Sequence, residues 1–293
     1  MFIAGIDGGG THTRIELRDM ANCLIRRGEF GPFNLNSIGV DAFRRLLHEV
    51  FDWCGSMECC ERLCIGAAGI SNPRVRSILA EELERSGFRG KWILCGDQEI
   101  ALRGAMDGAG AVVISGTGSI CFGKNEAGET SRSGGFGHLI DDGGSGYAIG
   151  RDVLASAVRT IDGRVKDSEI LQAVCTYLGG KPEAIVPFVY HPETDKSAIA
   201  RFSHIALDLA QRDDPEALRI LNTEAKELSE LVCAVQDRLE MHPCRIALLG
   251  GLLEANNPYR GIVSRELSKL GTVIAPAHNA LWGAAQMAWE LEH

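Results

Sequence analysis

Short apolar runs alternate with amphipathic helical patterns along the chain of 293 residues. Apolar runs between turn-forming residues are typical of buried strands, and apolar residues three and four positions apart predict helices. The first pattern predicts strands at 2–6, 13–18, 22–29, 62–70, 91–95, on both sides of a turn within 110–123, and at 244–253 and 272–276. The second predicts helices at 41–54, 72–87, 97–106, 259–271 and 279–292, and a long helical part at about 145–239 with breaks near 179–182 and 213–215. Strands that alternate with helices predict an α/β fold.

Some of the predicted helices carry recognisable start signals. Asp41 is a candidate N-cap of the helix at 41–54. Asn72 directly precedes Pro73, a sequence typical of a capped helix start. The helix at 97–106 is expected to begin at Asp97, directly after a buried strand.

A strand, a glycine-rich turn and a second strand occur twice, at residues 6–17 and 114–123. This duplication predicts two related α/β domains whose glycine turns face each other across a cleft, a usual place for a ligand. A linker is expected near Asp107–Gly110, in the segment MDGAGA. The expected division is a first domain at 1–108, a second domain with a helical insertion at 109–278, and a closing helix at 279–293 that packs back on the first domain.

Charge and hydropathy restrict the partners. The net charge of −9 and the lack of a Lys/Arg cluster argue against a nucleic-acid partner. No apolar run is long enough to cross a bilayer, and residues 1–6 are too short and uncharged for a signal peptide. We therefore expect a cytoplasmic protein without a membrane partner.

Ten cysteines raise the question of a metal site. Cys54, Cys59, Cys60 and Cys64 lie close together in the sequence and could hold a metal ion or an iron–sulfur cluster. There is no C-x-x-C motif, however, and two of the four continue predicted apolar stretches. Packing of free thiols in the core is therefore the favoured interpretation.

The turn after the first strand, IDGGGTHT at residues 6–13, has the chemistry of a phosphate site. Glycine lets the main chain approach a phosphate closely, and neighbouring hydroxyl groups add donors. Asp7 at the strand end could hold Mg²⁺ through water. The turn is neither a Walker sequence nor a Rossmann fingerprint, because it lacks the lysine motif and a strand follows it. A tight hairpin would explain one such turn, but the repeat in SGTGS and the glycine pair in LLGGLL favour phosphate binding.

Five segments together resemble a known family: IDGGGTHTR, CGDQEIALRGA, VVISGTGSICFG, GGFGHLIDDGGSGYAIG and LLGGL. In order and spacing they resemble the actin/hexokinase/Hsp70-type ATPase fold, with actin-like (ribonuclease H-like) domains. Within this fold they resemble the N-acetylglucosamine kinase group of the BadF/BadG/BcrA/BcrD ATPase family. The resemblance covers nearly the whole chain and implies ATP and Mg²⁺ as cofactors. Its motifs are more specific for the superfamily than for the sugar.

The resemblance implies a role for individual residues. It makes Asp97 the catalytic base and places Asp7 near Mg²⁺. The phosphate-binding residues that it implies are Gly8, Gly9, Gly10, Thr11 and Thr13 in the first turn, and Ser115, Gly116, Thr117, Gly118 and Ser119 in the second. Gly250 and Gly251 would border the adenosine. The sugar contacts that it implies are Asn34, Asp97, Thr117, Gly135, Phe136, Gly137 and Asp142.

Two departures from the family pattern lie on the sugar side. The family usually has Trp where this chain has Phe136, and GDEGS where this chain has DDGGS. Gly143 therefore removes an acidic side chain. These changes leave the exact sugar open and do not affect the residues that imply ATP binding.

The residues themselves support part of these roles. Phosphoryl transfer needs a group that accepts the proton of the attacking hydroxyl, and the carboxylate of Asp97 is suited to this task. Asp97 could instead only cap its helix, or do both. Phe136 between glycines could stack on a sugar ring or lie in the core.

For some other residues the sequence predicts only a general role. Asp141 and Asp142 are adjacent and would point to different sides of a regular strand, so only one of them is expected to bind a ligand. His138 is expected to steady its loop. Trp282 and Trp289 are seven positions apart and are expected to form a core stripe.

The sequence thus predicts a kinase that transfers the γ-phosphoryl group of ATP to an amino sugar, with N-acetylglucosamine or glucosamine preferred. The 6-hydroxyl as acceptor is implied by the resemblance alone. An ATPase activator of a partner reductase or dehydratase remains an alternative, although the segment GGFGHLIDD favours the kinase. A sugar-sensing regulator is a third possibility, but a first strand that begins at Phe2 leaves no room for a DNA-binding domain before it. A homodimer is expected, with the helical part as its candidate surface.

Overall fold

The computed structural model describes residues 1–10, 12–67, 69–70, 72–166 and 168–291. The chain divides into two compact units. Unit 1 comprises Met1–Asp107 and Pro276–His293, and unit 2 comprises Gly108–Ala275. In the described part of the chain, no helix is both long enough and apolar enough to span a bilayer.

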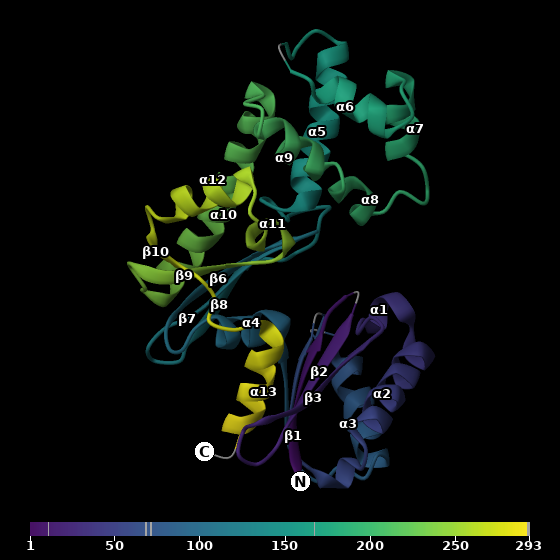
Figure 1. The fold of residues 1–293 in the computed structure, drawn as a ribbon, viewed down its shortest axis with the longest axis vertical. Coiled ribbons are helices and arrows are strands. Elements are labelled where there is room, and N and C mark those ends of the chain that lie inside the picture. The colour runs from purple at the N-terminus through teal and green to yellow at the C-terminus, as the bar shows by residue number, and fades with distance from the viewer. Residues whose placement is uncertain (11, 68, 71, 167, 292–293) are drawn as a thin grey trace. The chain divides into compact units, whose positions relative to one another are not determined.

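Unit 1 is built on a five-stranded sheet (Figure 1). Its strands are β1 (Phe2–Gly8), β2 (Thr13–Arg18), β3 (Leu24–Phe30), β4 (Cys60–Ala67) and β5 (Lys91–Gly96). Its helices are α1 (Leu35–Ile38), α2 (Val40–Cys54), the 3-10 helix η1 (Met57–Cys59), α3 (Pro73–Arg85), α4 (Asp97–Ala105) and α13 (Ala280–Glu290). The strand order is β3-β2-β1-β4-β5. β1 is antiparallel to β2 and parallel to β4, and β4 is parallel to β5.

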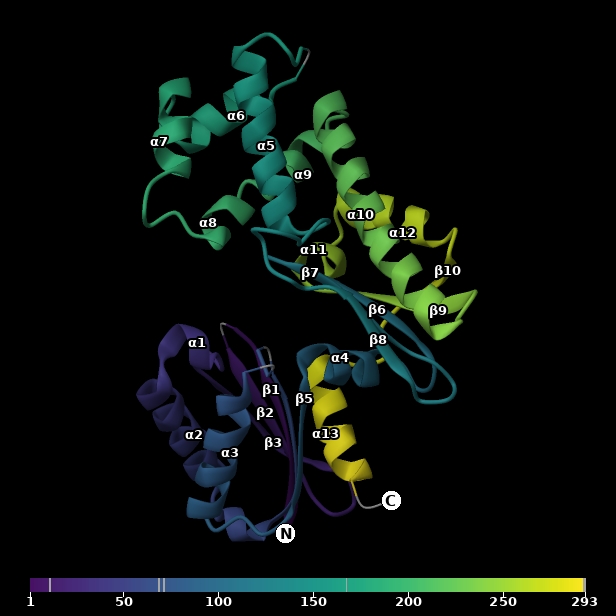
Figure 2. The same ribbon diagram turned by 180° about the vertical axis from the view of Figure 1, so that it is seen from behind.

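Helices cover both faces of this sheet, as the two opposite views show (Figures 1 and 2). On one face, α2 and α3 bury apolar side chains against the strands, among them Phe43 and Leu79. On the other face, α4 and α13 pack on the sheet around Ile100. Gly5 permits this close packing, because a Cβ atom there would lie 2.2 Å from the backbone nitrogen of Ala285.

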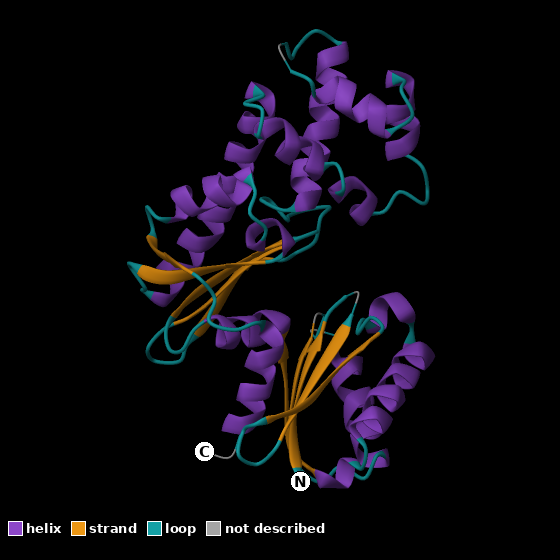
Figure 3. Ribbon diagram, in the orientation of Figure 1, coloured by secondary structure: helices purple, strands orange, loops and turns teal. Residues whose placement is uncertain are grey.

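Unit 2 contains a second five-stranded sheet and a larger group of helices (Figure 3). Its strands are β6 (Gly110–Ser115), β7 (Ser119–Lys124), β8 (Thr130–Gly134), β9 (Cys244–Leu249) and β10 (Gly271–Ile274). Its helices are α5 (Gly146–Ile161), α6 (Ile170–Tyr177), η2 (Pro182–Ala184), α7 (Ile185–Val189), α8 (Lys196–Ala200), α9 (Ser203–Ala210), α10 (Pro215–Leu239), α11 (Gly251–Glu254) and α12 (Pro258–Leu267). The long helix α10 packs against β7, β8 and α12.

The two sheets share one topology, β3-β2-β1-β4-β5 in unit 1 and β8-β7-β6-β9-β10 in unit 2. In each sheet the first two strands form a hairpin around a glycine turn, and the first strand has a parallel neighbour on its other side. The predicted α/β class is confirmed, and the repeated strand–turn–strand pattern corresponds to a repeated sheet.

Two local predictions were wrong and one strand was missed. The N-cap of α2 is Gly39 and α2 begins one residue before Asp41, so the acidic side chain lies in the first turn and does not cap it. Strand β8 was missed, because its sequence TSRSG has no apolar residue. Trp282 and Trp289 are partly exposed and do not form the core stripe. Arginine side chains cover the rings of both tryptophans instead, at 5.3 to 5.5 Å from the ring centroids.

Candidate functional site

The first glycine turn is held by backbone hydrogen bonds. The Gly9 N–H donates to the carbonyl of His12 at 2.9 Å, and the Gly9 carbonyl accepts from the N–H of Phe33 at 2.9 Å. Gly8 lies against the Phe33 ring, since a Cβ atom on Gly8 would be 2.7 Å from it. Gly10 is exposed in this turn, and Thr11 lies outside the described residues. Close packing therefore requires glycine at Gly8, and a Cβ atom on Gly9 would lie 3.0 Å from the carbonyl oxygen of His12.

Thr13, the last of the residues expected in the first phosphate turn, opens β2 and is buried. Its hydroxyl donates to the carbonyl of Gly31 at 2.6 Å. A hydroxyl has a single proton to donate. Since the Thr13 hydroxyl donates it to Gly31, it has no further proton for a phosphate oxygen in this conformation.

Two partly buried carboxylates lie at the carboxyl ends of parallel strands in unit 1. Asp7 is the last residue but one of β1, and Asp97 follows β5 directly. The strand between them, β4, ends in Gly66 and Ala67, which pair with β1 and β5 in register. A Cβ atom on Gly66 would lie 2.5 Å from the side chain of Ile100, so this glycine is required by packing. The carboxyl ends of the parallel strands form the sheet edge at which ligands of α/β sheets bind.

The pKa values of both carboxyl groups are raised, mainly by burial. Burial raises the pKa of Asp7 to about 6, against a lowering by the charge of Arg14, and the charge of Asp97 adds to the rise. Burial also raises the pKa of Asp97, although the N–H of Gln98 donates to its Oδ1 at 3.0 Å and opposes the shift. Carboxyl groups with raised pKa values at a sheet edge are typical of a functional site.

The helix α4 does not use Asp97 as its cap. The N-cap position is Gly96, whose N–H donates to Oε1 of Glu99 at 2.8 Å. The Asp97 side chain accepts from the neighbouring N–H of Gln98. The cap interpretation of Asp97 therefore loses its main support, whereas its role as a base is still a prediction.

Asn34, the expected sugar contact in unit 1, directly precedes α1. Its backbone carbonyl accepts the N–H of Ile38 at 3.1 Å, and the residue is partly buried. It follows Phe33, whose ring packs on the first glycine turn at Gly8. The sequence neighbour of Asn34 is thus part of the wall of that turn.

The second glycine turn, between β6 and β7, is fastened to the loop before α5. The Ser115 hydroxyl donates to the carbonyl of Gly144 at 2.7 Å, and the Ser119 hydroxyl donates to the carbonyl of Gly143 at 2.6 Å. Both serines are buried. Their hydroxyl protons therefore shape the turn, and they are not free to donate to a phosphate in this conformation.

Some hydrogen-bond donors at the tip of the second turn have no partner within the described residues. Gly116 donates its N–H to the carbonyl of Gly118 at 2.9 Å and accepts from the N–H of Gly146 at 2.8 Å. Among the residues described by the structure, no hydrogen bond engages the hydroxyl group of Thr117 or the backbone N–H groups of Thr117 and Gly118. These groups can bind an anion.

Asp142 lies beside this second turn. Asp142 is buried and its backbone has a φ of +67°. Its Oδ1 accepts a hydrogen bond from the N–H of Ser119 at 3.4 Å. A Cβ atom on Gly118 would lie 3.0 Å from Oδ2 of Asp142. Burial raises the pKa of Asp142, against a lowering by the Ser119 N–H and by the charge of Lys196. Its neighbour Asp141 is turned elsewhere and accepts the N–H of Phe136 at 3.2 Å.

The loop from Gly134 to His138 exposes an aromatic ring. Gly135 and Gly137 have φ values of +75° and +96°, and the Phe136 between them is 61% exposed, which excludes the core interpretation. The guanidinium of Arg132 lies 5.1 Å from the Phe136 ring centroid. The His138 ring packs edge-on against Tyr147 at 4.8 Å, a contact that fits its expected role in steadying the loop.

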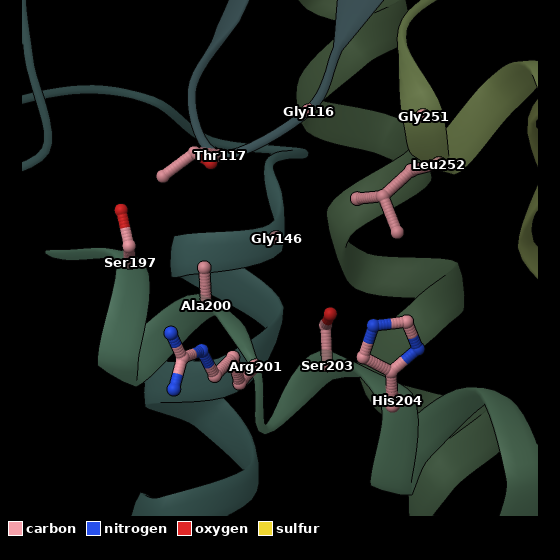
Figure 4. A pocket seen from close by; sticks show the side chains of 10 residues that line it. All are labelled: Gly116, Thr117, Gly146, Ser197, Ala200, Arg201, Ser203, His204, Gly251 and Leu252. Carbon is pink, nitrogen blue, oxygen red and sulfur yellow. The ribbon is translucent and has the colours of Figure 1, made fainter. Parts of the chain in front are cut away.

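A cavity of about 430 Å³ lies between the second turn and the helical part of unit 2 (Figure 4). One side is formed by Gly116, Thr117, Gly251 and Leu252, and the other by the segment around α8 and the start of α9 (Figure 4). The lining residues are Gly116, Thr117, Gly146, Ser197, Ala200, Arg201, Ser203, His204, Gly251 and Leu252. None of them has a carboxylate side chain.

The glycine pair after β9 contributes to this cavity in two ways. Gly250 has a φ of +90°, and a Cβ atom there would lie 2.4 Å from the carbonyl oxygen of Ser115. It therefore brings β9 against the second turn at a distance that only glycine permits. Gly251 opens α11 and lines the cavity.

Sequence analysis missed the lining residues of α8 and α9, among them Ser197, Arg201, Ser203 and His204. They lie in a helical stretch without a glycine turn, a repeat or a motif. No signal in a single sequence distinguishes them from ordinary surface residues.

The cysteine group has the properties of packed thiols. Cys54, Cys60 and Cys64 are buried and Cys59 is exposed. Burial raises the pKa values of Cys54 and Cys60 to about 12, and a thiol rather than a thiolate is a poor metal ligand. Within the ranges that the structure describes, no group of three or more His, Cys, Asp or Glu side chains is placed to hold a metal ion.

Comparison with known proteins agrees with this description. The profile of the BadF/BadG/BcrA/BcrD ATPase family matches residues 4–288. A curated relative from Clostridium acetobutylicum, named N-acetylmuramic acid/N-acetylglucosamine kinase, is 32% identical over 300 residues that cover 98% of each protein. The N-acetyl-D-glucosamine kinase of Dictyostelium discoideum is 29% identical over 287 residues, 90% of this chain and 88% of that protein.

A solved structure from Chromobacterium violaceum, provisionally described as an N-acetylglucosamine kinase, has a TM-score of 0.79 at 25% identity and covers 98% of each chain. The protein belongs to the BadF/BadG/BcrA/BcrD ATPase family. The resemblance drawn from the five sequence segments is thereby confirmed.

Proposed function

We propose that the protein is an ATP-dependent kinase that phosphorylates the 6-hydroxyl of an amino sugar of the N-acetylglucosamine type. The observation that carries the proposal is the pair of carboxylates Asp7 and Asp97, which lie at the carboxyl ends of parallel strands with raised pKa values. The names of the relatives from Clostridium acetobutylicum and Dictyostelium discoideum support the substrate class.

Unit 2 binds the nucleotide in this proposal. Its cavity of about 430 Å³ has a size ordinary for small-molecule sites. The open N–H groups of Thr117 and Gly118 and the Thr117 hydroxyl bind phosphate oxygens, and Gly250 and Gly251 border the adenosine. Ser115 and Ser119 act indirectly, because their hydroxyl groups hold the turn in shape through the carbonyls of Gly144 and Gly143.

Asp7 is the residue that would hold a magnesium ion. Its carboxylate forms no ion pair in the described part of unit 1 and ends a strand beside the first glycine turn. Oxygen ligands of this kind suit Mg²⁺, which keeps several waters and binds substrate phosphates through the remaining positions. The bound ion would supply charge neutralisation for the transferred phosphoryl group.

Asp97 accepts the proton of the attacking hydroxyl. Its raised pKa makes the carboxylate a better base near neutral pH than an ordinary aspartate. The Gln98 N–H, which donates to Oδ1, fixes the orientation of the carboxylate and leaves Oδ2 for the substrate hydroxyl.

The sugar is held by polar groups and by one aromatic ring. Phe136 is exposed in its loop and presents an apolar face, which suits the apolar face of a sugar ring. We assign Asn34, Gly135, Gly137 and Asp142 as the remaining contacts.

A coupled ADP-release assay tests the proposal. Wild-type protein with Mg-ATP is assayed against N-acetylglucosamine, glucosamine, N-acetylmannosamine, N-acetylmuramic acid, glucose and no sugar. We expect strong stimulation by an amino sugar, and the position of the new phosphate follows from ³¹P NMR of the product. Release of ADP that no sugar stimulates would contradict the kinase assignment.

The variant Asp97→Asn tests the base. It should lower kcat by roughly 10²- to 10⁴-fold while the affinity for ATP changes little. The exposed Asp41→Asn is the matched control and should keep full activity. Near-normal turnover of Asp97→Asn would show that another group accepts the proton.

A further inference from the structure

Two cationic residues lie in the lining of the cavity in unit 2 or next to it in the sequence. Arg201 lines the cavity with Ser197 and Ala200 (Figure 4), and Lys196 directly precedes Ser197 at the start of α8. Both residues are exposed. Within the described ranges, neither side chain forms an ion pair or a hydrogen bond. Some other arginines of unit 2 do form ion pairs, such as Arg219 with Glu216 at 2.8 Å.

Lys196 is close to the second glycine turn. Its charge acts on Asp142 and lowers the pKa of that carboxyl group against the effect of burial. Asp142 in turn accepts the N–H of Ser119 and lies 3.0 Å from the position of a Cβ atom on Gly118. The charge of Lys196 therefore acts on a carboxyl group beside the turn whose N–H donors are open, and the next residue, Ser197, lines the same cavity as Thr117 of that turn.

The surroundings of the cavity favour an anion. Its lining has no carboxylate, and the backbone N–H groups of Thr117 and Gly118 are unused in the described part of the chain. The protein as a whole carries a net charge of −9, which would repel a nucleotide triphosphate at a distance. Unpaired cations at the site supply the local attraction that such a ligand needs.

We propose that Lys196 binds the terminal phosphates of the nucleotide at the second glycine turn, and that Arg201 adds a positive charge to the lining of the cavity. The inference rests on the proposed binding of ATP in unit 2. A lysine suits the terminal position because its ammonium is a point charge on a flexible stem, which can follow a phosphate chain. Arg201 acts equally on nucleotides with one, two or three phosphates.

The test is equilibrium binding without sugar, by calorimetry, of Mg-ATP, Mg-ADP and AMP. The proteins compared are the wild type, Lys196→Met, Lys196→Arg, Arg201→Met and, as a matched control, the exposed Lys181→Met. Far-UV circular dichroism and the Tm of each variant check that the fold is kept. Because no sugar is present, the result does not depend on phosphoryl transfer.

Lys196→Met should weaken Mg-ATP roughly 10- to 100-fold, the range of a hydrogen bond to a charged group. Mg-ADP should be weakened less and AMP by less than about twofold. Lys196→Arg should keep most of the affinity for Mg-ATP, Arg201→Met should weaken all three nucleotides alike, and Lys181→Met should change none.

Two results would overturn the inference. One is that the wild type binds Mg-ATP and that Lys196→Met binds it with an affinity within about twofold of the wild-type value. The other is an equal loss for ATP, ADP and AMP, which would indicate a general distortion of the cavity. A wild type that binds none of the three would instead refute the nucleotide site and the proposed function with it.

Discussion

Replacing Asp7 by asparagine should make the protein more stable at neutral pH although it removes the proposed metal ligand. The pKa of Asp7 is raised from 3.8 to about 6, mainly by burial. Between these pH values the folded protein holds a proton that the unfolded chain has lost. The free energy of unfolding therefore falls as the pH rises from about 4 to about 6 and stays reduced above. Asparagine has no charge and avoids this cost.

The size of the effect follows from the shift. A pKa raised from 3.8 to about 6 corresponds to at most about 3 kcal/mol of lost stability at neutral pH. The amide of asparagine is itself polar, and the residue is partly accessible to water. We therefore expect Asp7→Asn to gain about 1 to 2 kcal/mol at pH 7.5, and nothing below about pH 4.

Urea unfolding of both proteins at a series of pH values from 4 to 8 measures this difference. Asp41→Asn, an exposed carboxylate of the same unit, is the control and should change the free energy of unfolding by less than about 0.5 kcal/mol at every pH. Mg-ATP should stabilise the wild type more than Asp7→Asn. A gain that is the same at all pH values, or a loss at pH 7.5, would refute the reasoning that burial of this carboxylate costs stability.

Further predictions concern the second glycine turn, the loop before α5 and the Phe136 ring. Gly144→Ala should destabilise the protein by about 2 to 4 kcal/mol in urea unfolding, because its φ is +79° and a Cβ atom would lie 2.3 Å from a leucine side chain of α10. The control is Gly163→Ala, where φ is +74° but the space is open, and it should lower the free energy of unfolding by only about 1 kcal/mol. Ser115→Ala should lower the free energy of unfolding by about 1 to 2 kcal/mol, whereas Thr117→Ala should keep it and raise the KM for ATP roughly 2- to 10-fold in the coupled assay. Phe136→Ala should change stability by less than about 1 kcal/mol and raise the KM for the sugar roughly tenfold; equal effects on the KM values of ATP and sugar would contradict its role.

The sequence predicted the sheets well because their strands are apolar and their turns rich in glycine. The run FIAGI and the run AVVIS each became the first strand of a five-stranded sheet. The breaks in the helical part also followed local chemistry, since Pro215 opens α10 behind an Asp214 that caps it. In these places the local preference and the tertiary fold agree.

The sequence failed where a residue's role depends on distant partners. Strand β8 is polar and pairs as the outer strand of its sheet, so periodicity could not find it. Phosphate binding by Ser115 and Ser119 stays a prediction, but no local pattern indicated that each hydroxyl donates to a carbonyl more than twenty residues away. The two tryptophans of α13 are covered by arginines from other elements. Such pairings are decided by tertiary contacts that no local pattern encodes.

The two units repeat one topology but differ in the charge of the groups beside their turns. In unit 1 the acid Asp7 is the last residue but one of the strand before the turn, and a second acid, Asp97, follows β5. In unit 2 the corresponding strand ends in Ser115, and the cavity beside its turn is lined by Arg201 and by no carboxylate. An acidic edge suits a metal ion and proton removal, and a cationic cavity suits the nucleotide. The repeated sheet topology thus places a glycine turn in each unit, and the different residues at the strand ends suit each turn to a different part of the chemistry that we propose.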